Sequence, residues 1–131
     1  MNDETTKEIN IYVINLKRDK ERWDKYKSNK IYKSYNAVNG SELPSTEPYL
    51  KKMIMMWNAS DKQRRNVVGC FLSHLNLIKK IVKQKLNKTL ILEDDAVIDF
   101  NKLKKLNLDK LPQDKMMYFG GILRGLTLKD K

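Results

Sequence analysis

The segment Leu90–Asp95, which reads LILEDD, places three consecutive carboxylates directly after an apolar run. The carboxylates of Glu93, Asp94 and Asp95 repel one another, and a bound divalent cation is the simplest relief of that repulsion. Carboxylate oxygens are also the ligands that Mg²⁺ and Mn²⁺ prefer. Because acidic triplets also occur in solvated turns and helix caps, the spacing alone predicts either a metal site or a surface turn.

A basic cluster follows a second predicted strand. The run Ile9–Leu16 (INIYVINL) is rich in β-branched residues and predicts a strand that is buried on both faces. It leads into Lys17 and Arg18, with Arg22 one helical turn later. Ligands of α/β sheets bind beyond the carboxyl ends of the strands. If the two strands are parallel neighbours, these cations face the carboxylates across a crevice that suits a metal-bridged nucleoside diphosphate. The alternative is that the arginines pair with surface acids such as Asp19.

Cys70 and His74 are the only residues of their types, and they stand four apart on a predicted helix. That spacing fits two metal ligands or a thiol–imidazole dyad, and a position near the helix N-terminus could lower the thiol pKa. No third member is apparent in the sequence, which favours a packed histidine and an unreactive cysteine. A single cysteine excludes an intrachain disulfide and a four-cysteine zinc site.

The elements that must position these groups form an α/β pattern. Apolar runs and helical periodicity predict strands over 9–16, 31–38, 89–92 and 116–119, and helices over 19–29, 49–57, 69–86 and 99–111. The polar, basic segment 58–66 predicts a mobile loop. On the helix 69–86, the 3.6-residue period predicts an inward stripe of Phe71, Leu75, Ile78 and Val82. This order is typical of a Rossmann-like, mostly parallel sheet flanked by helices.

The length, net charge and apolar content of the chain limit the class of protein and the kinds of partner. A length of 131 residues suits one domain over 1–131, with residues 1–8 expected to be a frayed tail. The net charge of +11 predicts a polyanionic partner, either nucleic acid, an anionic membrane surface or a phosphorylated small molecule. The lysines are scattered along the chain, so no specific nucleic acid is expected. There is no apolar leader and no apolar run near the ~20 residues that span a bilayer, which predicts a cytoplasmic protein without a transmembrane segment.

Three blocks, in order, resemble glycosyltransferase family 25, which includes bacterial lipooligosaccharide galactosyltransferases and the collagen galactosyltransferases. The blocks are IYVINLKRDKERW at 11–23, YNAVNG at 35–40 and GCFLSHLNLIKKIVKQKLNKTLILEDDAVI at 69–98. The segment YFGG at 118–121 is similar to a later strand end of the family. The resemblance covers residues 9–121, and the ordered set is far more specific than any one block.

The resemblance implies a GT-A-like donor-binding domain that can be incomplete on the acceptor side. It implies a UDP-sugar donor, usually UDP-galactose or UDP-glucose, a glycan or protein acceptor as in lipopolysaccharide biosynthesis, inversion at the anomeric carbon, and Mn²⁺ or Mg²⁺. Asp95 would bind the metal directly, with Glu93 as a second ligand. The implied donor-binding residues are Asn15, Leu16, Arg18, Arg22, Asn39, Gly40, Ser73, His74, Glu93 and Asp94. Asn39 departs from the family pattern, which usually has an acid there.

The short C-terminal part keeps several interpretations open. Family members continue beyond the YFGG strand with sequence that builds much of the acceptor site, and no general base is apparent in this chain. The chain is therefore a metal-dependent hexosyltransferase, an inactive or truncated donor-binding relic that serves as an interaction subunit, or a basic nucleic-acid-binding module. A missing acceptor side would leave apolar surface open, which predicts a homo-oligomer.

Overall fold

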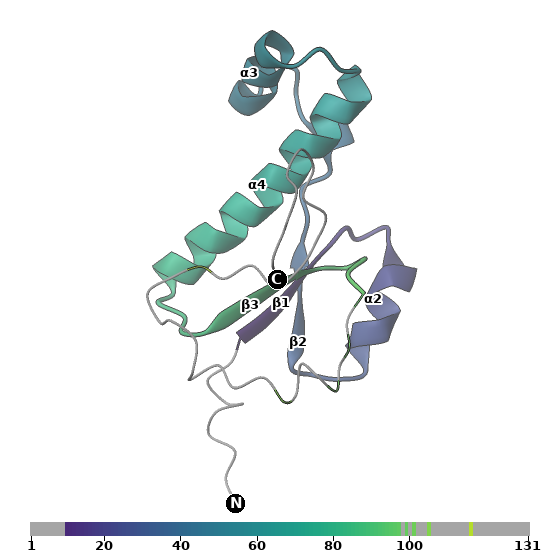
Figure 1. Ribbon diagram of the computed structural model, residues 1–131, viewed down its shortest axis with the longest axis vertical. Helices are drawn as coiled ribbons and strands as arrows, with labels where there is room; N and C mark the ends of the chain where they lie inside the picture. Colours follow the sequence, from purple (N-terminus) through teal and green to yellow (C-terminus); the bar gives the residue numbers. More distant parts are fainter. Residues whose placement is uncertain (1–9, 98, 100, 102–104, 106–115, 117–131) are drawn as a thin grey trace, which may run out of the picture.

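The computed structural model describes residues 10–97 together with Asp99, Asn101, Lys105 and Met116 (Figure 1). The predicted tail 1–8 lies outside the described residues. The predicted helix 99–111 and the predicted strand 116–119 also lie outside them, apart from these single positions.

A three-stranded parallel sheet forms the centre of the described chain. Its elements in chain order are β1 (Asn10–Asn15), α2 (Lys20–Lys27), β2 (Tyr32–Asn36), the 3₁₀ helix η1 (Gly40–Glu42), α3 (Pro48–Met56), α4 (Asp61–Lys83) and β3 (Thr89–Glu93). The strand order is β2-β1-β3, and both pairings of β1 are parallel. The predicted α/β fold is therefore confirmed, and so is the burial of the first strand, which is continuous from Ile11 to Asn15.

The long helix α4 covers one face of this sheet. Tyr12 and Ile14 of β1 point to that face and form a buried cluster with Leu77 of α4. Ile81 of the helix and Ile91 of β3 pack against the cluster as partly buried neighbours. Burial of these apolar side chains supplies the free energy that holds α4 against the sheet.

The short helix α2 lies on the opposite face (Figure 1). Ile11 and Val13 alternate to this face of β1 and are buried. The register pairs Ile11 with Tyr32 of β2, and the Tyr32 ring contacts the buried ring of Tyr26 from α2 at a centroid distance of 5.4 Å. Helices on both faces explain why β1 reads as a continuous apolar run.

Helix α4 begins eight residues before the predicted start. The segment 58–66, predicted to be a mobile loop, contains the first turns of the helix, so that prediction is wrong. The Ser60 side chain accepts a hydrogen bond from the Gln63 backbone, and the Gln63 side chain accepts one from the Ser60 backbone. This reciprocal pair is a capping box, which satisfies donors that an uncapped helix would leave exposed.

The predicted inward stripe of α4 is also wrong. Phe71 and Val82 are exposed, whereas the buried positions of the helix are Val68, Gly69, Ser73 and Leu77. The rotation of α4 follows from a close backbone contact between Gly69 and Gly40. A Cβ at Gly69 would lie 2.8 Å from the Gly40 nitrogen, and a Cβ at Gly40 would lie 2.0 Å from the Arg65 carbonyl oxygen.

Within the described residues, none of the helices has the length and apolar character that crossing a membrane requires.

Replacing Gly69 with alanine tests this contact. Alanine favours a helix by roughly 1 kcal/mol over glycine, but here its methyl group must push two backbones apart. We expect Gly69→Ala to lower the free energy of unfolding by about 1–2 kcal/mol in urea titrations. Asn76→Ala, at an exposed position of the same helix, is the control and should be neutral or slightly stabilising. Equal stabilisation by both substitutions would contradict the contact.

Candidate functional site

A pocket of about 210 Å³ lies at the carboxyl ends of β1 and β3, where parallel α/β sheets bind ligands. Most of the predicted site residues line it: Leu16, Arg18, Arg22, Asn39, Gly40, Ser73, Glu93, Asp94 and Asp95. The two other predicted residues, Asn15 and His74, contact the side chains of Asp94 and Glu93, respectively. The structure therefore brings together residues that are up to 80 positions apart in the sequence.

Asp94 is buried and joins three elements at this edge of the sheet. One carboxylate oxygen accepts a hydrogen bond of 2.8 Å from the Asn15 amide, and the other lies 3.5 Å from a guanidinium nitrogen of Arg22. The same Asn15 amide donates to the backbone carbonyl of Asp19, just before α2. The Asp94 backbone donates to the carbonyl of Ile14, so the acidic turn stays attached to β1. Both oxygens of Asp94 are thus bound by the protein.

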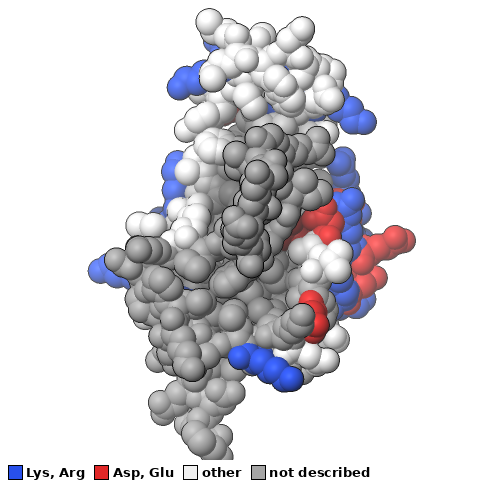
Figure 2. Space-filling view, in the orientation of Figure 1, with Lys and Arg blue, Asp and Glu red and all other residues white. Residues whose placement is uncertain are grey.

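Cations and anions adjoin one another around the pocket. Arg18 and Arg22 line it together with Glu93 and Asp95. The face in Figure 2 shows basic and acidic side chains next to one another along its right-hand edge, on the side where α2 lies. Arg22 is 55% exposed and keeps guanidinium donors beyond the one that faces Asp94. Such an arrangement can bind a phosphate group and a divalent cation at the same place.

The loop after β2 forms another wall of the pocket. The Ser73 hydroxyl accepts a hydrogen bond of 2.8 Å from the Val38 backbone and donates one of 2.7 Å to the Gly69 carbonyl. The Asn39 side chain accepts hydrogen bonds from the backbone and the hydroxyl of Ser41, the second residue of η1. These bonds fix the loop against α4, so Asn39 and Gly40 line the pocket through a rigid connection.

Glu93 supplies the third member that the sequence did not reveal for the pair Cys70 and His74. One carboxylate oxygen, Oε1, accepts a hydrogen bond of 3.4 Å from the Cys70 thiol and lies 3.1 Å from Nε2 of His74. The ligand atoms of these three residues lie within 4.8 Å of one another, and they form the one such gathering of His, Cys, Asp and Glu side chains in the described part of the chain. Asp95 is exposed and lines the pocket outside this group.

The alternative of a lowered thiol pKa, which the sequence left open, is contradicted. Cys70 is an exposed residue, but partial desolvation of its sulfur raises the pKa of the thiol to about 11, and the charge and hydrogen bond of the Glu93 carboxylate act in the same direction. Cys70 also lies in the third turn of α4 and not at its N-terminus, because the helix begins at Asp61. The thiol is therefore protonated near neutral pH, in keeping with the predicted unreactive cysteine.

Several lining residues were not assigned to this pocket by sequence reasoning: Ile14, Asp19, Ala37, Val38, Asn66 and Cys70, the last of which was considered only as a partner of His74. A helical signal was available for two of them. Asn66, Cys70 and Ser73 follow a spacing of four and three, which puts them on one face of α4. The capping box at Ser60 would have extended the helix far enough to show this face.

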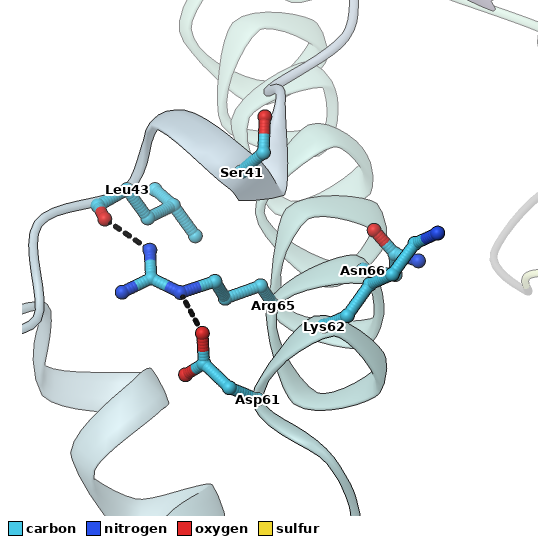
Figure 3. A pocket seen from close by; sticks show the side chains of 6 residues that line it. All are labelled: Ser41, Leu43, Asp61, Lys62, Arg65 and Asn66. Atoms are coloured by element: carbon cyan, nitrogen blue, oxygen red, sulfur yellow. Dashed lines mark hydrogen bonds and ion pairs between the residues drawn. The ribbon is translucent and has the colours of Figure 1, made fainter.

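A second hollow of about 480 Å³ lies at the start of α4 and shares Asn66 with the first (Figure 3). Figure 3 shows the Arg65 side chain between the carboxylate of Asp61, at 2.8 Å, and the carbonyl oxygen of Leu43. The arginine is thus bound by the protein on both sides. These contacts of Arg65 hold α4 to the loop after η1, so the ion pair in this hollow has a structural role.

Comparisons with known proteins place most of the chain in one family. Residues 8–126 match glycosyltransferase family 25, described as an LPS biosynthesis protein. The chain is 32% identical over 126 residues to human procollagen galactosyltransferase 2, an alignment that covers 84% of this chain and 20% of that protein. It is 32% identical over 129 residues to the putative glycosyltransferase R655 of Acanthamoeba polyphaga mimivirus, with 89% of this chain and 39% of that protein covered. No solved structure matches the chain.

The protonated thiol leads to a prediction about its reactivity. A pKa of about 11 in place of 9.0 lowers the thiolate fraction near pH 8 by roughly 100-fold. We expect iodoacetamide to modify Cys70 in the folded protein roughly 100-fold more slowly than in the urea-unfolded chain. Glu93→Gln removes the neighbouring negative charge and should raise the rate, whereas the control Glu21→Gln on α2 should not. A pH–rate profile with a midpoint near 9 in the folded wild type would contradict the prediction.

Proposed function

Because the chain belongs to glycosyltransferase family 25, we propose that the pocket at the ends of β1 and β3 binds the diphosphate of a nucleotide-sugar donor. The observation that carries the proposal is the meeting of Arg18 and Arg22 with Glu93 and Asp95 around one pocket. A metal-bound diphosphate carries negative oxygens for the arginines and a cation for the carboxylates. In the second hollow, by contrast, the lining carboxylate of Asp61 is already paired with Arg65.

The acidic turn fits a divalent cation at two of its three carboxylates. Both oxygens of Asp94 accept protein hydrogen bonds or face Arg22, so this residue positions the turn and the arginine. Glu93 and Asp95 are exposed and can bind Mn²⁺ or Mg²⁺ through their oxygens. When bound, the metal would supply Lewis-acid stabilisation of the negative charge on the leaving diphosphate.

The residues on the α2 side would hold the donor's phosphates. Arg22 is oriented by Asp94, and its remaining N–H groups can bind phosphate oxygens in a bidentate manner. Arg18 is exposed at the rim of the same pocket and adds a second positive charge. Asn15 contributes through Asp94, because its amide fixes the carboxylate that orients Arg22. The rigid loop at Asn39 and Gly40 would close the side towards α4.

The proposed reaction is the inverting transfer of a hexose, galactose or glucose, from a UDP-sugar to a glycan or protein acceptor. The matches to procollagen galactosyltransferases support a hexosyl donor and an acceptor hydroxyl. The acceptor oxygen would bond to the anomeric carbon as the bond from that carbon to the diphosphate breaks, and the acceptor proton would leave to a base. The chain spans only a fifth of the length of the human relative, so the binding of an acceptor by this chain is likewise a proposal.

Donor binding should stabilise the fold. A nucleotide sugar at about ten times its Kd adds about 1.4 kcal/mol, which raises the Tm of a domain of this size by about 5 °C. We expect this shift with UDP-galactose or UDP-glucose plus Mn²⁺, and a smaller one without the metal. Asp95→Asn should abolish the metal-dependent part, whereas Asp24→Asn, the same change on the exposed side of α2, should keep it. The absence of a shift with UDP-, GDP- and CMP-sugars would refute donor binding.

Substitutions of Arg22 and Lys20 distinguish a local phosphate contact from a general effect of positive charge. Both side chains are exposed cations of α2, but only Arg22 lines the pocket. Losing a charge-assisted hydrogen bond costs about 1.5 kcal/mol or more, so Arg22→Gln should weaken UDP binding by roughly 10-fold in calorimetry. Lys20→Gln should leave the Kd within about twofold. Equal losses for the two variants would instead indicate binding by net charge, as in a nucleic-acid-binding module.

A further inference from the structure

Cys70, His74 and Glu93 form a cluster with the composition of a transition-metal site. Cys70 and His74 lie one turn apart on the same face of α4, and Glu93 ends β3 beside them. The distances of 3.4 Å from sulfur to Oε1 and 3.1 Å from Nε2 to Oε1 are close to the edge of a zinc tetrahedron, which is about 3.5 Å. We propose that these three side chains bind Zn²⁺.

The types of ligand select zinc over the cations of the acidic turn. Thiolate and imidazole are soft or intermediate ligands that favour Zn²⁺, whereas Mg²⁺ and Mn²⁺ favour sites built from oxygen. All three ligand atoms lie within 4.8 Å of one another, so small side-chain rotations complete the set. Three protein ligands leave a fourth position for water or another small ligand.

The cluster is also accessible and chemically competent. The side chains of His74 and Glu93 are 37% and 49% exposed, and Cys70 is exposed, so an ion can enter from solvent. Binding forms a zinc–sulfur bond, and the proton of the Cys70 thiol leaves to solvent. The imidazole also exchanges its Nε2 proton for one at Nδ1 through solvent, so the hydrogen bond to Glu93 is lost and the lone pair freed at Nε2 binds zinc.

Zinc binding does not rest on the proposed function, but the two share Glu93. An ion held by Cys70, His74 and Glu93 withdraws this carboxylate from the metal proposed for the donor. Asp95, which is outside the cluster, therefore separates the two sites in an experiment.

Cobalt provides a direct probe, because a Co²⁺–thiolate bond gives a charge-transfer absorption band in the near ultraviolet. Cys70 is the only cysteine of the chain, so any such band reports this residue. The whole chain, treated with a chelator and kept reduced, is titrated with Co²⁺ and then with Zn²⁺. We expect a band that saturates at one cobalt per chain and disappears as one equivalent of zinc displaces it.

Substitutions at four positions decide the outcome, with folding of each variant checked by circular dichroism. Cys70→Ser should lose the band, with Cys70→Ala as a second version. His74→Gln and Glu93→Gln should weaken zinc binding by at least roughly 10-fold in competition with a chromophoric chelator. Asp95→Asn should retain the band and the zinc affinity.

Three results would overturn the proposal. The first is the absence of a band in the wild type, and the second is saturation at one cobalt per two chains. The third is a zinc affinity that does not follow the cluster, either unchanged in His74→Gln and Glu93→Gln or lost in Asp95→Asn. A chain that binds zinc as expected but shows no donor-dependent stabilisation would refute only the proposed function.

Discussion

The buried carboxylate of Asp94 is the constraint on which the pocket depends. Asp94 is only 7% exposed, and a carboxylate out of water is stable only with hydrogen-bond donors or cations around it. Its donors are Asn15, from the end of β1, and Arg22, from α2. The ends of two strands and the orientation of one helix are therefore fixed together. The charged rim of the pocket follows from this arrangement, because Arg22 is drawn towards the acidic turn.

The other side of the pocket depends on the absence of side chains at Gly40 and Gly69. With no Cβ at either position, α4 comes close enough to the loop after β2 for the Ser73 hydroxyl to bond the Val38 backbone. This contact sets the rotation of α4 about its axis and directs Cys70 towards the end of β3. Two small residues thus determine which side chains of a long helix reach the site.

The parts of the structure that the sequence predicts are those with a local signal. The apolar run before Asn15 and the acidic turn at the end of β3 can each be recognised from neighbouring residues. The general rule that α/β proteins bind ligands at the carboxyl ends of parallel strands then predicts that they meet. The rotation of α4 was not predictable from hydrophobic periodicity, because a glycine contact and a buried serine set it while Phe71 stays exposed. The partner of Cys70 and His74 was missed for a similar reason. Glu93 lies on another element, and only the tertiary structure brings it to the helix.

The three adjacent carboxylates cannot act as one ligand set, because neighbouring residues at a strand end point in different directions. Asp94 points inward and is bound by the protein, and Asp95 is exposed towards the pocket. Glu93 can serve either of two sites, because its Oε1 atom faces Cys70 and His74 and the residue also lines the pocket. The Glu93 carboxylate faces α4 when Cys70 and His74 bind it, and it would face the pocket when a cation there binds it. Helix α4, through Cys70 and His74, therefore also orients one of the two carboxylates that are free to bind a cation at the turn.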